Sequence, residues 1–511
     1  MPRTLSVGDP FDDLASVLAL REPDTRIRLA GAARARVRAS RAVIERAIAS
    51  GATVYGVNTG FGKLANVSIP REQTERLQRN LILSHATGVG ELLPVPTARL
   101  AFGLRIHNLA RGYSGVRPEL LDAAIALYNA GLTPAIPSQG SVGASGDLAP
   151  LAHMALPLLG EGEVLDDAGR RLSGRRALEV AGIAPVRLTA KEGLALINGT
   201  QVMTAIGLMA FAHAELLSKA ADIACATTIE ALRASARPFR KGVHEVRPHR
   251  GQERTAANVR RLLVGSEILR SHAHCGKVQD AYSMRCAPQV HGAAKDALAF
   301  AREVLRVEAD AVTDNPLVFP DGEVVSAGNF HGQPVSQAMD FLAIGVATLA
   351  NISERRIENL VNPDISGLPP FLAHEPGLES GFMIPQVVAA ALASENKSLA
   401  HPASVDTIPT SANREDHVSM GVTAARHAAM VVDNTSRVLA IELLTACQGL
   451  DVGEPLRPGK GVAAAHAVVR RRVAPLRGDR ILAPDIAAID AMLRDGTLVG
   501  AVERAVGKLH A

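Results

Sequence analysis

Three long stretches of apolar residues at helical spacing dominate the pattern along the chain. They cover about residues 189–232, 334–361 and 418–448, and in each the apolar positions recur every three or four residues. The first is expected to break at Gly199, and the third to end at Gly449, a residue suited to close a helix. Helices of this length, rich in alanine, predict a mainly α fold built on a bundle of long helices.

Residues that favour helix starts and stops mark the ends of these stretches. Thr189 to Glu192 has the spacing of a capping box, which predicts a helix start there. Pro334 suits the first turn of the second helix, and Asn362-Pro363 stops it. Loops rich in glycine and proline lie between the helices, at residues 56–62, 134–146, 315–332 and 363–383.

Strand-like alternation is scarce outside one segment. Residues 164–172 contain Asp166 and Gly169, which suit a tight turn, so a small hairpin is predicted. The polar segment 451–480 is expected to be a surface connection before a short C-terminal helical region. We expect two domains: a loop-rich N-terminal domain, residues 1–197, and a long-helix bundle with the C-terminal helices, residues 198–511.

Composition narrows the class of protein. Of the 511 residues, 47% are hydrophobic and 21% charged, which is typical of a globular chain. The net charge of +4 is too small to predict a surface for nucleic acids or anionic membranes. With 3% aromatic residues and no Trp, the chain also lacks the stacking platforms of a single-strand binder. The four cysteines form no C-x-x-C pair and no metal cluster is evident, so no metal is expected.

The same sequence predicts a cytoplasmic protein. Few cysteines fit a reducing compartment, and no signal peptide is visible before the first apolar run. Residues 193–214 are free of Asp, Glu, Lys and Arg and are long enough to span a bilayer. Lipid would penalise the polar cluster Asn198-Gly199-Thr200-Gln201 inside this segment. We therefore expect the segment to form the interior of a large helical protein.

A run of glycine and serine, residues 140–146, is the strongest chemical signal. No Lys-Ser/Thr follows its last glycine and G-x-G-x-x-G does not match, so neither common phosphate-binding loop is predicted. One reading is a flexible turn ahead of a helix at Asp147. The other is self-cyclisation: the Gly146 amide nitrogen attacks the Ala144 carbonyl carbon, and water is lost. Loss of the Ser145 hydroxyl as a second water leaves a 4-methylidene-imidazol-5-one ring (MIO), a strong electrophile.

The longer segment Gly140–Gly160 resembles the signature of the aromatic amino-acid ammonia-lyases, and within that family the chain most resembles the histidine branch. The resemblance covers essentially the full length. Further matching segments are Tyr55–Gly62, Leu83–Ala86, Asn198–Gln201, Gln279–Arg285, Gly328–His331 and Glu415–Ser419. The resemblance implies a fumarase/aspartase-like long-helix bundle, a homotetramer with sites shared between subunits, and MIO formed from Ala144-Ser145-Gly146 as the only cofactor. The implied reaction is elimination of ammonia from L-histidine to give trans-urocanate, the first step of histidine degradation.

Elimination of ammonia needs such an electrophile. The β-hydrogen of an amino acid is hardly acidic, and each pKa unit of mismatch with a base costs about 1.4 kcal/mol. A group that first takes electron density from the substrate removes that obstacle. Since no metal cluster or pyridoxal lysine motif is evident, the ring and the reaction explain each other.

The resemblance assigns roles to two of the four tyrosines. Tyr55, in a glycine-rich loop, is expected to be the general base, although a tyrosine there could also anchor the loop by packing. Tyr282 is expected to orient the electrophile or the ligand by hydrogen bonding; the alternative is a packed core tyrosine. Arg285 follows Tyr282 at i+3, so both side chains could project from one helical face.

Substrate contacts are predicted at several further residues. A guanidinium binds a carboxylate in a two-point fork, so Arg285 is the natural partner of the substrate carboxylate, with Asn198 holding the other end. Asn198 could instead be a helix-kink residue beside Gly199. Glu415 could pair with an imidazole, and the Ser84-His85 pair is the form associated with the histidine branch. Phe330 is expected to pack on the substrate, and Gln279 to join the hydrogen bonds.

Three residues depart from the pattern of the histidine branch. Arg414 stands where Gln is usual, Ala327 where Gly is usual, and Gln333 where Glu is frequent. Arg414 adds a positive charge beside Glu415 and could alter how that carboxylate meets a substrate. The departures leave the elimination chemistry in place but open the choice of amino acid.

Other functions remain open at this stage. Within the same chemistry the alternatives are a phenylalanine or tyrosine ammonia-lyase and a 2,3-aminomutase. A different class is a catalytically silent helical scaffold. A fumarase-type or argininosuccinate-type lyase shares long helical bundles, but the Gly-Ser-Ser-x-Met-Pro-x-Lys signature of that group is not found.

Overall fold

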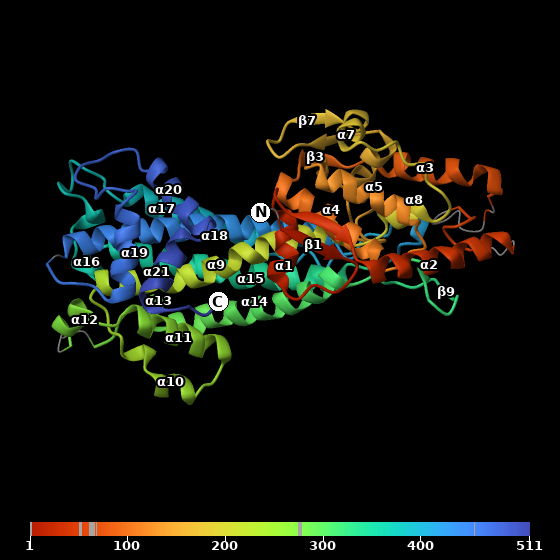
Figure 1. Ribbon diagram of the computed structural model, residues 1–511. Coiled ribbons are helices and arrows are strands. Elements are labelled where there is room, and N and C mark those ends of the chain that lie inside the picture. The colour runs from red at the N-terminus through yellow and green to blue at the C-terminus, as the bar shows by residue number, and fades with distance from the viewer. Residues whose placement is uncertain (1–2, 51–53, 61–66, 68, 274–277, 454) are drawn as a thin grey trace. The chain divides into compact units, whose positions relative to one another are not determined.

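The structure is a computed structural model of the 511-residue chain (Figure 1). It describes residues 3–50, 54–60, 67, 69–273, 278–453 and 455–511. The chain forms two compact units with segments that alternate along the sequence: unit 1 comprises residues 1–209, 303–339 and 402–426, and unit 2 comprises 210–302, 340–401 and 427–511. The two continuous domains expected from the sequence stay a prediction.

Four long helices contribute residues to both units and confirm the mainly α, long-helix class. They are α9 (Gln201–Ala231), α14 (Ala287–Asp310), α15 (Gln333–Val361) and α18 (Gly421–Val452). By length and composition α9 and α15 could cross a membrane, but 72% of the most apolar window of each is buried. These segments are therefore helices of the protein core, as expected for the uncharged stretch 193–214.

Unit 1 surrounds its parts of these helices with shorter elements. Its helices are α1 (Leu14–Leu18), α2 (Gly31–Ala49), α3 (Thr74–His85), α4 (Val95–Ala110), α5 (Pro118–Asn129), α6 (Leu148–Ala155), α7 (Gly174–Ala181) and α8 (Glu192–Ile197), with 3-10 turns η1 (Ala19–Arg21), η3 (Arg71–Gln73), η4 (Leu156–Leu159) and η7 (Ser411–Asn413). Its strands are β1 (Thr4–Val7), β2 (Arg26–Leu29), β3 (Val89–Leu92), β4 (Thr133–Pro134), β5 (Pro137–Gln139), β6 (Glu163–Leu165), β7 (Arg171–Ser173), β8 (Leu317–Val318) and β9 (Val324–Val325). They form four small sheets, ordered β1-β2, β3-β5, β4-β6-β7 and β8-β9, of which only β1-β2 is parallel among the described strands.

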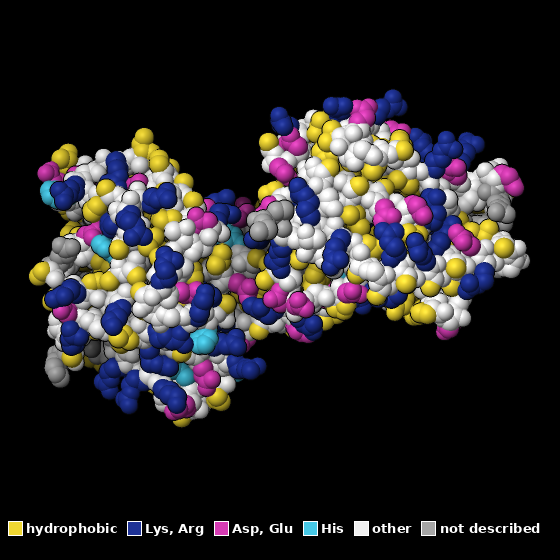
Figure 2. Space-filling view, viewed as in Figure 1, with side chains coloured by type: hydrophobic (Ala, Val, Ile, Leu, Met, Phe, Trp, Pro, Cys, Tyr) yellow, Lys and Arg dark blue, Asp and Glu magenta, His cyan; other side chains and the backbone are white. Residues whose placement is uncertain are grey.

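The regular elements of unit 2 are all helices among its described residues. Beyond its parts of the long helices it contains α10 (Lys241–Glu245), α11 (Arg250–Leu262), α12 (Glu267–Ser271), α13 (Tyr282–Arg285), α16 (Pro363–Ser366), α17 (Met383–Leu399), α19 (Lys460–Arg470), α20 (Ala483–Arg494) and α21 (Thr497–Val506), with 3-10 turns η5 (Arg237–Phe239) and η6 (Pro370–Leu372). On the face of the molecule shown in Figure 2, basic and acidic side chains are interspersed, in keeping with the small net charge.

The break in the first long stretch is confirmed. Helix α8 ends at Ile197 and α9 begins at Gln201. At Gly199, between them, a Cβ would lie 2.4 Å from Nη1 of the buried Arg105, so only glycine fits this close approach. The capping box is only half formed. The Thr189 amide donates to Glu192 Oε2 (2.8 Å), but the residue before α8 is Lys191, with φ of 75°. Lys191 leaves the helical conformation as its ammonium reaches Asp314 (2.7 Å), both side chains being fully buried.

The other long stretches differ at one end. Helix α15 stops before Asn362, as predicted, and the Asn362 side chain then caps α16 by accepting from the Asp364 amide (3.1 Å). Helix α18 continues to Val452, so the expected end at Gly449 is wrong. A Cβ at Gly449 would lie 3.1 Å from the Ala231 Cβ, and glycine therefore serves close helix packing there.

The prediction of a hairpin is confirmed, whereas the prediction for the polar C-terminal segment is only partly right. Strands β6 and β7 pair with Val164 opposite Leu172, and Asp166 accepts hydrogen bonds from the turn amides, which confirms the hairpin. Residues 451–480 are not only a surface connection, because they contain helix α19. Its buried Val462, Ala465, Val468 and Val469 lie at helical spacing, a signal that the surrounding polar residues obscured.

Candidate active site

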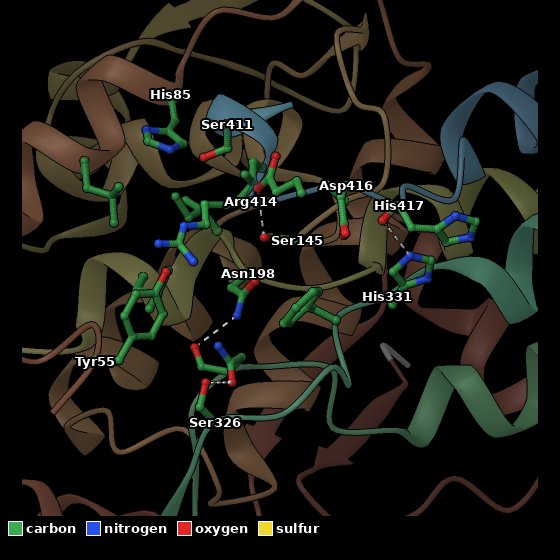
Figure 3. A pocket seen from close by; sticks show the side chains of 18 residues that line it. Tyr55, His85, Ser145, Asn198, Ser326, His331, Ser411, Arg414, Asp416 and His417 are labelled. Carbon is green, nitrogen blue, oxygen red and sulfur yellow. Dashed lines mark hydrogen bonds between the residues drawn. The ribbon is translucent and has the colours of Figure 1, made fainter. Parts of the chain in front are cut away.

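Unit 1 encloses a cavity of about 540 Å³ that collects most of the predicted site residues (Figure 3). The predicted residues that line it are Tyr55, His85, Ala144, Ser145, Asn198, Phe330 and Glu415. A neighbouring hollow of about 220 Å³ is lined by Gly146 and shares His85, Ala144 and Glu415 with the larger cavity. Segments that are far apart in the sequence therefore meet around one space.

Each residue is placed by the end of an element or by a loop held to one. His85 is the last residue of α3, and Asn198 lies in the break between α8 and α9. The Ala144-Ser145-Gly146 loop immediately precedes α6, Phe330 precedes α15, and Glu415 follows η7. Loops fixed by rigid helices are common places for binding and catalytic groups.

The loop that carries Ser145 is sharply bent and fixed. Gly146 has φ of +72°, and a Cβ there would lie 2.1 Å from the Gly199 carbonyl oxygen. The next amide, of Asp147, donates to that same oxygen (2.7 Å). Ser419 donates from its hydroxyl to the Gly143 carbonyl (2.9 Å), which holds the loop from the other side. The turn does lead into a helix whose N-cap is Asp147, as the simpler of the two readings expected, and hydrogen bonds hold it on both sides.

Asp147 anchors the same loop to the start of α9. Its side chain is fully buried, and Oδ2 accepts from the Val202 and Met203 amides, both at 2.9 Å. Burial raises its pKa to about 7, although these amides and the Ser141 hydroxyl act in the opposite direction. The N-terminus of a long helix favours the charged carboxylate, which compensates part of the cost of burial.

Glu415 is directed at the predicted electrophile. The Ser145 hydroxyl donates to Glu415 Oε1 (3.2 Å), and the Thr410 hydroxyl donates to Oε2 (2.6 Å). Ala144, which precedes Ser145, is buried. These contacts fix the Glu415 carboxylate beside the cavity.

Asn198 is both a break residue and a cavity residue. Its Nδ2 donates to Asp314 Oδ1 (3.3 Å) and to the Asn315 carbonyl (3.1 Å). Both donor hydrogens are thereby directed at the loop behind it. The amide group is held in one orientation, with its oxygen as the atom left to accept.

His85 carries a neutral ring near pH 7. Burial lowers its pKa, against smaller raising effects from the Leu81 carbonyl and Glu415. The Ser84 hydroxyl lies 3.1 Å from Nδ1. A neutral imidazole can both donate and accept a hydrogen bond, so this residue can recognise a polar substrate ring.

Some lining residues were not predicted. His331 and His417 stack with centroids 5.7 Å apart, and His331 Nε2 lies 3.2 Å from the His417 carbonyl oxygen. Both histidines stand inside segments that matched the family, which was the available signal. Asn315 and Ser326, joined by a 3.2 Å hydrogen bond, lie in a loop with no periodic pattern. Nothing in the sequence marked these two residues as part of a site. The remaining unpredicted lining residues are Leu81, Leu148, Leu194, Ile197, Ser411, Arg414 and Asp416.

Three predicted residues belong to unit 2 and do not line this cavity. Tyr282 and Arg285 lie on α13, with the guanidinium 4.4 Å from the ring centroid, so they do share one helical face. Tyr282 is 70% exposed, so the alternative of a packed core tyrosine is wrong. Gln279 is also exposed.

The three residues that depart from the pattern of the histidine branch have different surroundings in the structure. Arg414 lines the cavity. The Ala327 amide donates to Asn315 Oδ1 (2.7 Å), and Gln333 Nε2 donates to the Ser404 carbonyl (3.1 Å). Only Arg414 of the three thus faces the space where a substrate would lie.

A family model described as "Aromatic amino acid lyase" matches residues 12–471. The chain belongs to the aromatic amino acid lyase family. Within it, the chain is 56% identical to a protein named histidine ammonia-lyase from Anaeromyxobacter sp. (strain K), over 95% of this chain and 97% of that one. The solved histidine ammonia-lyase from Trypanosoma cruzi is 45% identical with a TM-score of 0.91, covering 99% of this chain and 96% of that chain.

Solved aminomutases share the fold as well. The tyrosine aminomutase from Streptomyces globisporus is 38% identical with a TM-score of 0.93, and all of each chain is covered. The protein is thus a carbon–nitrogen lyase by family. Sequence identity is higher to the relatives that are named for histidine.

Proposed function

We propose that this protein removes ammonia from L-histidine to give trans-urocanate, in the cytoplasm. The observation that carries the proposal is the cavity itself, where the Ser145 loop, Tyr55, His85 and Glu415 face one space. A neutral imidazole and a carboxylate on its walls suit a substrate that carries an imidazole. The relatives named histidine ammonia-lyase support the same substrate.

We further propose that Ala144, Ser145 and Gly146 form the MIO ring. The fixed bend at Gly146 and the space that excludes a Cβ there suit attack by the Gly146 nitrogen on the Ala144 carbonyl carbon. Glu415, bonded to the Ser145 hydroxyl, is placed to assist the loss of that hydroxyl as water. Once formed, the ring supplies the electrophile that withdraws electron density from the substrate.

The chain's own residues would bind the substrate and move protons. Tyr55 would take the β-proton through its phenolic oxygen. The side-chain amide oxygen of Asn198 would accept a hydrogen bond from the amino group of the substrate. Glu415 would accept a hydrogen bond from the substrate imidazole. Phe330 and Leu81, on the cavity wall, would exclude water from the apolar part of the ligand.

Gln279, Tyr282 and Arg285 would reach the site from another subunit of a homotetramer. The exposure of Tyr282 and the buried Arg285 Nε, which has no hydrogen-bond partner among the described residues, support this assignment. An unpaired buried guanidinium nitrogen is costly, and a partner surface or a carboxylate ligand would relieve it. Tyr282 would then orient the ligand and Arg285 would bind the substrate carboxylate.

The test is incubation with L-histidine while ultraviolet absorbance follows a conjugated acrylate and released ammonium is assayed. Parallel reactions with L-tyrosine and L-phenylalanine separate the other lyases of the family, and a strong preference for L-tyrosine would overturn the histidine assignment. Product analysis for β-amino acids detects a mutase. Intact mass detects the ring as the loss of two waters, and an unmodified mass in protein without turnover would favour a scaffold.

A further inference from the structure

A turn with an unusual backbone forms one wall of the cavity. Ser411, Ala412 and Asn413 have φ of 50°, 53° and 64°, three consecutive non-glycine residues in the left-handed region. The turn is closed by Thr410 and Glu415, whose backbone amides each donate to the other's carbonyl, at 3.0 and 3.3 Å. Strained backbone of this kind persists where the surrounding structure holds it, and it is concentrated at ligand sites. Here it fixes the direction of Arg414.

Arg414 points into the cavity. Figure 3 shows its guanidinium and the Tyr55 hydroxyl directed toward one another, and both residues line the cavity. Within the described part of the chain, no hydrogen bond or ion pair is found for the Arg414 side chain. The two oxygens of the neighbouring Glu415 accept from the Thr410 and Ser145 hydroxyls, and no ion pair joins Glu415 to Arg414 among the described residues.

The charges around the cavity make this guanidinium distinctive. It is the one Lys or Arg side chain among the described lining residues. The other titratable groups that face the same space are the acids Glu415 and Asp416 and the imidazoles His85, His331 and His417. Two carboxylates oppose the ionisation of a phenol, and burial keeps His85 neutral. Arg414 is the permanent cation among the described lining residues, and it can offset the two carboxylates.

We propose that Arg414 is a positioning residue that stabilises the phenolate of Tyr55, and so sets the lowest pH at which Tyr55 can take the β-proton. The inference rests on the proposed function, since it assumes that Tyr55 is the base. A cation beside a phenol favours its ionised form, and a guanidinium remains charged at every pH at which the enzyme would work. Binding of the substrate carboxylate would remain with Arg285.

The decisive experiment compares pH profiles of kcat/KM for wild type, Arg414→Gln and Arg414→Lys. Substrate ionisations are identical in all three, so a difference between profiles reports the enzyme. We expect Arg414→Gln to move the acidic limb to higher pH by about one unit, a roughly tenfold loss on that limb. Above the limb, KM should change by less than about twofold, and Arg414→Lys should restore most of the shift.

One control variant and two possible results decide whether the proposal is wrong. Arg175→Gln removes an exposed arginine from α7 and should leave the profile unchanged. A raised KM with an unshifted limb would show that Arg414 binds the substrate carboxylate instead, and an unaltered Arg414→Gln profile would also overturn the proposal.

A second readout does not depend on turnover. The chain has four tyrosines and no Trp, so the near-ultraviolet absorbance of a phenolate can be followed in a pH titration. The component lost in Tyr55→Phe identifies Tyr55, and in Arg414→Gln it should appear at higher pH than in wild type. If wild type fails to act on L-histidine, the proposed function fails, while this titration still decides the inference. Coincident titrations in wild type and Arg414→Gln would overturn it.

Discussion

Ser145 is the residue on which the proposed chemistry depends. Replacing it by alanine removes the hydroxyl that must leave when the ring forms, and also its hydrogen bond to Glu415 (3.2 Å). We expect Ser145→Ala to fold and assemble but to lose most elimination activity, by about 1000-fold or more, the scale of a missing transition-state electrophile. Its intact mass should equal the mass calculated for the substituted chain, without the loss of two waters that ring formation would cause. Near wild-type turnover would contradict the role of the loop.

Gly146 tests whether the bend itself is required. In Gly146→Ala the new Cβ would meet the Gly199 carbonyl at 2.1 Å, a backbone atom that cannot easily move. Gly169→Ala is a matched control, since it has a similar φ of +76° but nothing within 4 Å of its Cβ. Both variants carry the left-handed penalty of about 1 kcal/mol. We expect only Gly146→Ala to lose ring formation by mass and to be destabilised by several degrees more in thermal unfolding.

At this scale, prediction from sequence succeeded where a residue stood in a distinctive local pattern. Ser145, Tyr55 and Glu415 each lie in a segment that matched the family, and the structure brings all three to one cavity. Asn315 and Ser326 also line it, but their positions depend on loop hydrogen bonds that leave no pattern in the sequence. Their roles could be read only from the fold.

Among the helices, α9 contains a carboxylate whose burial links stability to pH. Burial raises the pKa of Glu230 to about 7, against hydrogen bonds from Ser266 and from the Gly459 amide ahead of α19. Between the ordinary pKa of 4.5 and about 7 the folded state binds the proton more tightly than the unfolded state. The contribution of this group to stability is therefore greatest below pH 4.5 and falls as pH rises to about 7.

Glu230→Gln should remove that dependence. We expect the variant to gain about 1–3 kcal/mol over wild type between pH 5 and pH 7.5, measured as the free energy of urea unfolding at each pH. The exposed Glu245 on α10 is the matched control, and Glu245→Gln should show no such divergence. If the free energy of unfolding of Glu230→Gln fell relative to wild type as pH rises, the assignment would be contradicted.

The elements themselves were predictable to different degrees. Apolar periodicity located α9, α15 and α18, because long buried stripes need many residues in phase. It did not locate the end of α18, since Gly449 lies against Ala231 where two helices pack closely. Propensity describes a residue alone, and contact with another helix overrode it.

At the scale of the whole molecule, the predicted site residues are divided between the two units of the chain. Within unit 1 the cavity is lined by Ala144, Ser145 and Tyr55, whereas Gln279, Tyr282 and Arg285 belong to unit 2 and do not line it. The sequence could not reveal this division, because order along a chain does not say which copy supplies a residue. Symmetric homo-oligomers allow one surface to complete the site of another.

Co-expression of two inactive variants tests that arrangement. If Tyr282 reaches the site from a partner, mixing Ser145→Ala with Tyr282→Phe should create sites with both groups intact, in roughly a quarter of positions by random pairing of subunits. We expect a corresponding fraction of wild-type turnover of L-histidine to return. The matched control mixes Ser145→Ala with Tyr55→Phe, both changes being on the walls of one chain's cavity, and should recover nothing. Equal recovery in the two mixtures, or none in either, would contradict a site shared in this way.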